Sequence, residues 1–228
     1  MINTLKTIAY IKTDFPSKFG IPRQSGLVNK LRARIIFTPE YRNSEALRGL
    51  DGYSHLWLIW GFSQIDSDAE WRPTVRPPRL GGNRRMGVFA TRSPYRPNPL
   101  GLSSVAIEKI DFDCAEAPVI TVCGADCADN TPIYDIKPYL PITDCHPDAS
   151  GGFSDEKSGY GLKVSVQPDV ISVIPEDKRE ALIELLSQDP RPAYQNSPER
   201  VYGFVYAGYE VKFTVNGDTV MIISAERK

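Results

Sequence analysis

Seven arginines lie in one segment of this 228-residue chain, between Trp71 and Ile107, with no lysine and no acidic residue among them. They are Arg72, Arg76, Arg79, Arg84, Arg85, Arg92 and Arg96. The remaining residues hold 20 basic and 28 acidic side chains, so a local charge of +7 stands in a chain of net charge −1. A plain solvated face normally mixes both signs and uses lysine freely. Because guanidinium groups bind phosphates and carboxylates through paired hydrogen bonds, the block favours an anionic partner.

Four segments, one of them the arginine-rich stretch itself, combine proline with charged or hydroxyl side chains. They are Ile21–Gln24, the arginine-rich stretch that contains Arg76–Arg79 and Ala90–Ser103, Asp126–Pro141, and Asp189–Tyr194. Six prolines between Arg72 and Pro99 restrict the backbone of that stretch. Rigid turns at the corners of a barrel would explain any one segment alone. Four together favour loops that position functional groups.

Other common catalytic groups are absent from the sequence. It has no glycine-rich phosphate loop, no dinucleotide fingerprint and no serine elbow. Of the two histidines, His55 lies in an apolar run and is predicted to be a satisfied core histidine, and His146 lies beside a linker. No cluster has metal-ligand spacing, so no metal is expected. Four cysteines without a C-x-x-C pair are expected to be reduced thiols packed as small apolar groups.

These loops require a scaffold, and the elements around them are mostly short strands. The predicted strands of the first part are Thr4–Thr13, Arg34–Phe37, His55–Phe62, Met86–Thr91, Ser104–Phe112, Val119–Cys123 and Thr131–Ile136. A short helix is expected from Ser44 to Arg48, ended by Gly49. His55–Phe62 is almost continuously apolar, which predicts a strand buried on both faces. The spacing of the strands predicts a β-barrel or sandwich.

The composition changes to Gly, Ser, Asp and Lys from His146 to Gly161, which indicates a linker. We therefore expect a domain over 1–145, a linker over 146–161 and a small α+β domain over 162–228. In the last of these, a helix begins at Pro175 and is stopped by Asp189-Pro190, and a hairpin turns at Asn216-Gly217.

The 41% apolar and 24% charged residues match an ordinary globular protein. No window approaches 18 consecutive apolar residues, and the N-terminus does not resemble a secretion signal. We expect a cytoplasmic protein that does not enter a membrane.

The motifs, in their order along the chain, resemble those of the TsaA-like family. The similar segments are Pro22–Gln24, Asp51–Ile59, Trp71–Gly82, Gly87–Pro99, Asp135–Pro141 and Asp189–Tyr194, and the likeness runs from about Ile8 to the C-terminus. Bacterial members of the TrmO type are tRNA methyltransferases that use S-adenosylmethionine to methylate N6 of threonylcarbamoyladenosine next to the anticodon. The resemblance implies a mainly β fold, with an antiparallel β-barrel that binds the cofactor, a small C-terminal α+β domain, and a homodimer that shares the active site.

The resemblance also implies which residues bind S-adenosylmethionine. They are Pro22, Arg23, Gln24, Ser63, Gln64, Arg92, Leu102, Ala125, Asp126, Cys127 and Asp129. Asp126 has the chemistry to hold a ribose or the methionine ammonium, and Arg23 or Arg92 the carboxylate. Two positions depart from the family pattern. Asn130 stands where relatives often have glycine, and Ser63 stands where some have histidine, which puts an adenine contact there in doubt.

We therefore predict a methyltransferase acting on tRNA that carries threonylcarbamoyladenosine. Methyl transfer from a sulfonium is an in-line displacement that depends on positioning, so a shortage of nucleophiles is no obstacle. Candidates for handling the N6 proton are Asp135, Lys137 and Tyr194, with Arg191 as electrostatic support. Contacts to phosphate are expected from Arg72, Arg76, Arg79, Arg84, Arg85 and Arg96. The alternatives are a methyltransferase for a small molecule or a protein on the same scaffold, and a non-catalytic RNA-binding barrel.

Overall fold

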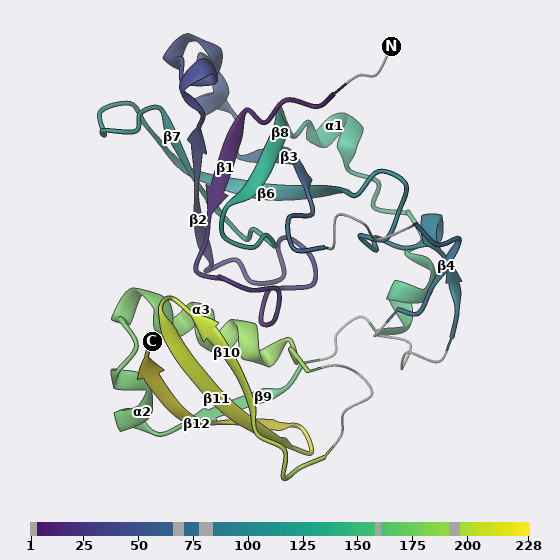
Figure 1. The fold of residues 1–228 in the computed structure, drawn as a ribbon, viewed down its shortest axis with the longest axis vertical. Helices are drawn as coiled ribbons and strands as arrows, with labels where there is room; N and C mark the ends of the chain where they lie inside the picture. The colour runs from purple at the N-terminus through teal and green to yellow at the C-terminus, as the bar shows by residue number, and fades with distance from the viewer. Residues whose placement is uncertain (1–3, 66–70, 78–83, 158–160, 192–196) are drawn as a thin grey trace.

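The first part of the chain closes into a six-stranded antiparallel barrel in a computed structural model, which describes residues 4–65, 71–77, 84–157, 161–191 and 197–228 (Figure 1). Around the barrel the strands follow the order β1-β2-β7-β6-β3-β8, and β8 pairs with β1 to close it. Their bounds are β1 Ala9–Lys12, β2 Arg32–Phe37, β3 His55–Gly61, β6 Leu100–Asp111, β7 Val119–Cys123 and β8 Thr131–Pro138. The predicted β-barrel is confirmed.

Alternation of buried and more exposed side chains along strands such as β1, β2 and β3 fills the barrel interior, whereas the first four residues of β7 are all buried. In β3, Leu56, Leu58 and Trp60 are buried, whereas His55 is exposed and Trp57 is half-buried. The predictions that this strand is buried on both faces and that His55 belongs to the core are therefore wrong. The outward apolar side chains are covered instead by the chain after β8: Trp57 packs on Tyr139, with ring centroids 5.5 Å apart, and donates its indole N–H to Asp144 at 2.7 Å. That aspartate ends the short helix α1 (Pro141–Asp144).

The strand predictions differ from the structure mainly at their ends. Thr4–Thr13 forms a strand only over Ala9–Lys12, and Met86–Thr91 only over Met86–Gly87 (β5), which pairs with β4 (Thr74–Val75). After β5 the chain makes a single 3₁₀ turn, Val88–Ala90. Of the four cysteines, all unpaired, Cys127 is buried but Cys145 is exposed, so the expected packing fails for the latter.

The second unit is a four-stranded sheet with helices packed against it, in the order β10-β11-β12-β9. Its elements are β9 Lys163–Val166, α2 Pro168–Ser172, α3 Glu176–Ser187, β10 Tyr202–Tyr206, β11 Tyr209–Asn216 and β12 Thr219–Arg227. The predicted helix and hairpin are present. Because Asn216 pairs with Thr219, the turn consists of Gly217 and Asp218, one residue later than expected. In the part of the chain that the structure describes, no helix is long and apolar enough to cross a membrane.

The loop between β1 and β2 binds the two units together (Figure 1). Phe15, Val28 and Leu31 belong to the same buried cluster as the leucines of α3 and the inner face of the second sheet. Asp14 accepts a hydrogen bond from Lys178 of α3 at 2.6 Å, and the backbone at Gly20 passes so close to Phe204 that a Cβ there would lie 2.4 Å from its ring. The division of the chain at 146–161 stays a prediction, but the first 31 residues contribute to both cores.

Candidate functional site

A cavity of about 780 Å³ opens at the barrel end that faces the second unit, within the size range of small-molecule sites. Its lining includes eight of the eleven residues expected to bind the cofactor. They are Pro22, Arg23, Gln24, Ser63, Gln64, Arg92, Leu102 and Asp126. They come from five parts of the chain: the loop after β1, the segment after β3, the segment between β5 and β6, the start of β6 and the loop after β7.

Asp126 is the acidic side chain among the lining residues, and its orientation is fixed by a chain of hydrogen bonds. Trp60 donates its indole N–H to the hydroxyl of Ser103 at 2.9 Å, and that hydroxyl donates to a carboxylate oxygen of Asp126 at 2.5 Å. Ser103 is buried, and the indole lies across Gly101, where a Cβ would be 2.1 Å from the ring. The barrel wall therefore holds the carboxylate in one place.

Burial raises the pKa of Asp126, while the hydrogen bond from Ser103, backbone amides and the charge of Arg92 partly offset this rise. A largely desolvated carboxylate gains from a cationic or hydroxyl-bearing ligand, because such a ligand restores part of the lost solvation. Methionine ammonium and ribose hydroxyls both have this chemistry. Together with the apolar wall of Phe62 and Leu102, the carboxylate of Asp126 and the guanidinium of Arg92 fit S-adenosylmethionine.

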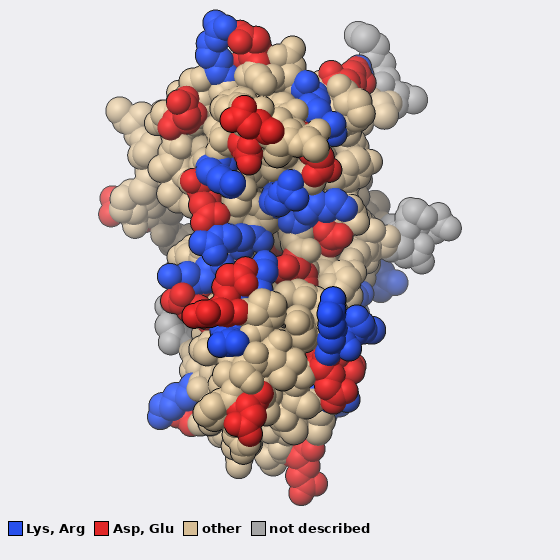
Figure 2. All heavy atoms as spheres, turned by 90° about the vertical axis from the view of Figure 1, so that its left-hand side faces the viewer, with Lys and Arg blue, Asp and Glu red and all other residues tan. Residues whose placement is uncertain are grey.

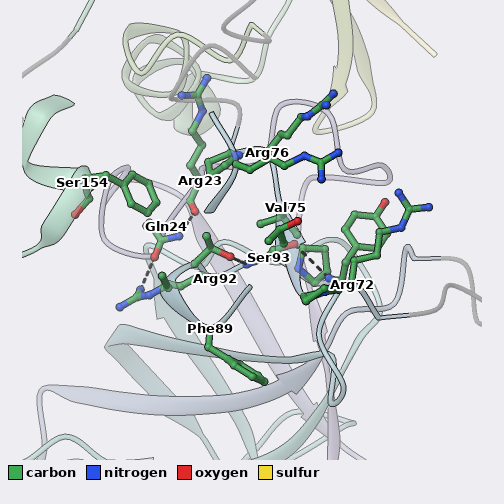
Figure 3. Close-up of a pocket in the computed structure, with 18 of the residues that line it drawn as sticks. Arg23, Gln24, Arg72, Val75, Arg76, Phe89, Arg92, Ser93 and Ser154 are labelled. Carbon is green, nitrogen blue, oxygen red and sulfur yellow. Dashed lines mark hydrogen bonds between the residues drawn. The ribbon is translucent and has the colours of Figure 1, made fainter. Parts of the chain in front are cut away.

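The neutral amide of Gln24 links two arginines that line the cavity, Arg23 and Arg92 (Figure 3). Its carbonyl oxygen accepts a hydrogen bond from Arg92, and its amide N–H donates to the backbone carbonyl of Arg23 at 2.5 Å. The guanidinium of Arg23 points away, toward the second unit, where it donates to the backbone carbonyls of Asp189 and Arg191 at 3.0 and 2.9 Å. Arg92 thus remains at the cavity, whereas Arg23 fastens the loop that forms one of its walls.

Three of the expected cofactor residues lie beside the cavity and support it. Ala125 and Cys127 are buried in the barrel core. Asp129 accepts a hydrogen bond from the backbone N–H of Thr13 at 3.0 Å and so ties the β7–β8 loop to the end of β1. Asn130 follows at φ 61°, the left-handed conformation that Asn tolerates best after Gly. Asn therefore fits the backbone at a position where relatives often have glycine.

A second, larger cleft of about 1990 Å³ adjoins the cavity and shares Arg23, Gln24, Phe89 and Arg92 with it. Arg72, Arg76 and Arg85 also line it, and Ser154 approaches from the linker (Figure 3). Many basic groups elsewhere in the described chain are paired with acidic ones: Arg32 contacts Glu108 at 2.7 Å and Lys30 contacts Glu180 at 3.3 Å. Figure 2 shows a face on which both signs are interspersed in this way. The cleft instead concentrates positive charge next to the cavity.

The other predicted phosphate contacts have different positions. Arg84 is exposed, and Arg96 is half-buried and lines the barrel cavity. Arg79 lies outside the described residues.

Of the predicted catalytic residues that the structure describes, Asp135 and Lys137 lie together on β8, whereas Arg191 lies in the second unit after α3. Asp135 and Lys137 form an ion pair of 3.1 Å near the end of β8 that leads to α1, outside both described cavities (Figure 1). Arg191 is buried after α3, where its guanidinium makes two hydrogen bonds to the carboxylate of Asp189, at 2.8 and 2.9 Å. Tyr194 lies outside the described residues.

The sequence reasoning missed Trp60 and Ser103 as supports of Asp126. Both lie at inward positions of barrel strands, so the sequence pattern does not distinguish them from ordinary core residues. A polar serine at an inward position of β6 was the signal available.

Comparison with known proteins agrees with this geometry. Residues 10–145 match the family model described as the tRNA-methyltransferase O N-terminal domain, and residues 162–228 match the TrmO C-terminal domain. The chain is 41% identical over 215 residues to the tRNA (adenine(37)-N6)-methyltransferase of Escherichia coli K12, covering 91% of this chain and 89% of that protein. It is 45% identical over 172 residues to the enzyme of the same description from Eikenella corrodens, covering 75% and 95%.

Solved structures give the same answer. A crystal structure of TrmO from Pseudomonas aeruginosa superposes with a TM-score of 0.79 at 30% identity, covering 99% of each chain. The family resemblance inferred from the motifs is thereby confirmed. With both domain models matched in order and a barrel cavity lined by the expected residues, the chain belongs to the tRNA-methyltransferase O family.

Proposed function

We propose that this protein is an S-adenosylmethionine-dependent methyltransferase that methylates N6 of adenosine 37 in tRNA. Its support is the placement of a cofactor-sized cavity, with an oriented carboxylate, directly beside an arginine-lined cleft. The relatives named above carry this activity in their descriptions. A small-molecule methyltransferase would have no use for the wide cationic cleft, and a non-catalytic RNA-binding barrel would have no use for the buried carboxylate.

S-adenosylmethionine supplies an electrophilic methyl group when bound. The residues of the chain bind and orient: Asp126 holds the ammonium or ribose hydroxyls, Arg92 balances its charge, and the arginines of the cleft bind phosphates of the anticodon loop. Because the displacement is in line, rate depends on the alignment of N6 with the methyl group. The hydrogen bonds that fix Asp126 serve that alignment.

We further propose that adenosine 37 must already carry the threonylcarbamoyl group to be methylated. The carboxylate of this group is an anion that plain adenosine lacks, and Lys137 is an exposed cation next to Asp135 on β8. Lys137, Asp135 and Tyr194 are the proposed groups around the N6 proton. A cationic site gains little from unmodified adenosine, which would explain selectivity.

A homodimer would bring these groups to a cavity. Asp135 and Lys137 lie away from the cavity of their own chain, so a second copy that presents them to it would complete the site. Mixing Lys137→Ala protein with Arg92→Ala protein tests this arrangement, because a mixed dimer has one cavity with both intact groups. Activity of the mixture above that of either variant alone supports a shared site. If light scattering shows dimers in the mixture and no activity is recovered, the shared site is contradicted. A cytoplasmic location agrees with a tRNA substrate.

The reaction is tested with labelled S-adenosylmethionine and tRNA from cells with and without the threonylcarbamoyl modification, followed by nucleoside analysis. We expect label in methylated threonylcarbamoyladenosine only. Equal labelling of unmodified tRNA would refute the requirement for the threonylcarbamoyl group, and no labelling of either tRNA would refute the methyltransferase activity.

A further inference from the structure

Phe89 is the most exposed aromatic side chain of the described residues, with 73% of its surface open to solvent. A lone exposed apolar residue is ordinary on a protein surface. Phe89 differs because it lines both the barrel cavity and the arginine-lined cleft. The ring therefore lies on the wall that separates the proposed methyl donor from the proposed phosphate contacts.

The backbone that carries Phe89 is firmly held. Its neighbour Val88 is only 1% exposed, and the N–H of Val88 donates to the carbonyl of Pro73 at 2.9 Å. The carbonyl of Val88 accepts from both the N–H and the hydroxyl of Thr91, at 3.1 and 2.9 Å. A buried anchor on one side and a closed turn on the other hold the backbone from which the ring projects.

One partner of the ring is already present. The guanidinium carbon of Arg96 lies 6.0 Å from the ring centroid, and Arg96 also donates to the carbonyl of Thr91 at 3.1 Å. The high exposure of Phe89 leaves room for a second planar group on the ring. By contrast, the aromatic rings inside the cavity are committed to each other, since Trp60 packs edge-on to Phe62 with centroids 4.5 Å apart.

We propose that Phe89 is the stacking platform for the target adenine of the tRNA. This inference rests on the proposed function, in which N6 must leave the base stack of the RNA and reach the methyl donor. An unstacked base gains binding energy from an aromatic face, and a rigid ring loses little entropy when it binds. At this wall the base would have its phosphates over the arginines and its N6 edge toward the cavity.

The test compares Phe89→Ala and Phe89→Leu with Phe89→Tyr and Phe89→Trp in the full chain, using modified tRNA. Phe112→Ala is the matched control, because Phe112 is 47% exposed but lines neither described cavity. We expect the Ala and Leu variants to lose roughly 10- to 100-fold in kcat/KM for tRNA, the scale of base–aromatic stacking. The aromatic variants and the control should stay within about three-fold of wild type, and the Kd for S-adenosylmethionine, measured by calorimetry, within about two-fold.

Three outcomes overturn the proposal. A Leu variant with wild-type kcat/KM shows that stacking is not needed while the methyltransferase function stands. A Kd for S-adenosylmethionine that rises in step with the loss of activity makes Phe89 a cofactor contact instead. A wild-type protein that does not methylate tRNA refutes the proposed function, and the stacking role with it.

Discussion

Replacing Arg191 with alanine should destabilise the protein strongly, because this arginine is half of a buried ion pair in the turn that follows α3. The side chains of Arg191 and Asp189 are only 9% and 13% exposed, and they share two hydrogen bonds. Without the guanidinium, the carboxylate of Asp189 stays buried and loses this partner. Breaking a buried pair on one side costs about 3–5 kcal/mol. For a chain of this length that corresponds to a fall in Tm on the order of 10 °C.

The same change should weaken cofactor binding indirectly. The carbonyls of Asp189 and Arg191 accept both hydrogen bonds from Arg23, whose neighbours Pro22 and Gln24 line the cavity. Loosening that turn frees the loop, so the cofactor must pay the entropy of ordering it. Arg23→Ala should therefore raise the Kd for S-adenosylmethionine with a smaller loss of Tm than Arg191→Ala.

Thermal unfolding by calorimetry, together with the Kd for S-adenosylmethionine, measures both effects. Arg48→Ala is the control, since Arg48 is also ion-paired but 77% exposed, and surface pairs contribute at most about 1 kcal/mol. The double variant Asp189→Asn/Arg191→Ala should recover part of the loss, because it leaves no buried charge. A Tm for Arg191→Ala within about 2 °C of wild type would refute the reasoning.

Three more outcomes follow from the geometry. Asp126→Asn should weaken S-adenosylmethionine binding about ten-fold or more without loss of Tm. In the wild type, binding should weaken as the pH falls through the raised pKa of Asp126, because only the ionised carboxylate attracts the ammonium. Calorimetric titration across pH checks both effects, and a pH-independent Kd would contradict this role. The logarithm of the binding constant for tRNA should fall by about 0.7 to 0.9 per unit of the logarithm of salt concentration for each phosphate contact. The double variant Arg72→Glu/Arg76→Glu should flatten that slope, and an unchanged slope would mean that these arginines do not contact phosphate. Asn130→Gly should leave the free energy of unfolding nearly unchanged, while Asn130→Ala should lower it by about 1 kcal/mol, because alanine is strained at φ 61°. Urea unfolding measures both free energies, and equal stability of the two variants would argue against strain.

Local pattern was enough to predict most strands, the lone long helix and the order of the motifs. Alternating apolar residues identify a strand such as Tyr209–Asn216 whatever it pairs with, and proline with acidic residues marks the start of α3. The motif series likewise predicted eleven cofactor residues, and eight of them line one cavity. These features depend on residue types and spacing, which a sequence carries in full.

Pairing and orientation between distant segments were decided only by the tertiary structure. Apolar residues on both faces of β3 suggested full burial, but closure by β1 and β8 turns one face outward and leaves His55 in solvent. The motif containing Arg23 suggested a cofactor contact, but its guanidinium binds carbonyls of a turn more than 160 residues away. Arg191 looked like an anion-binding group until its pairing with Asp189 was seen. A side chain's partner is chosen by packing across the whole chain, and spacing along the sequence contains no record of that choice.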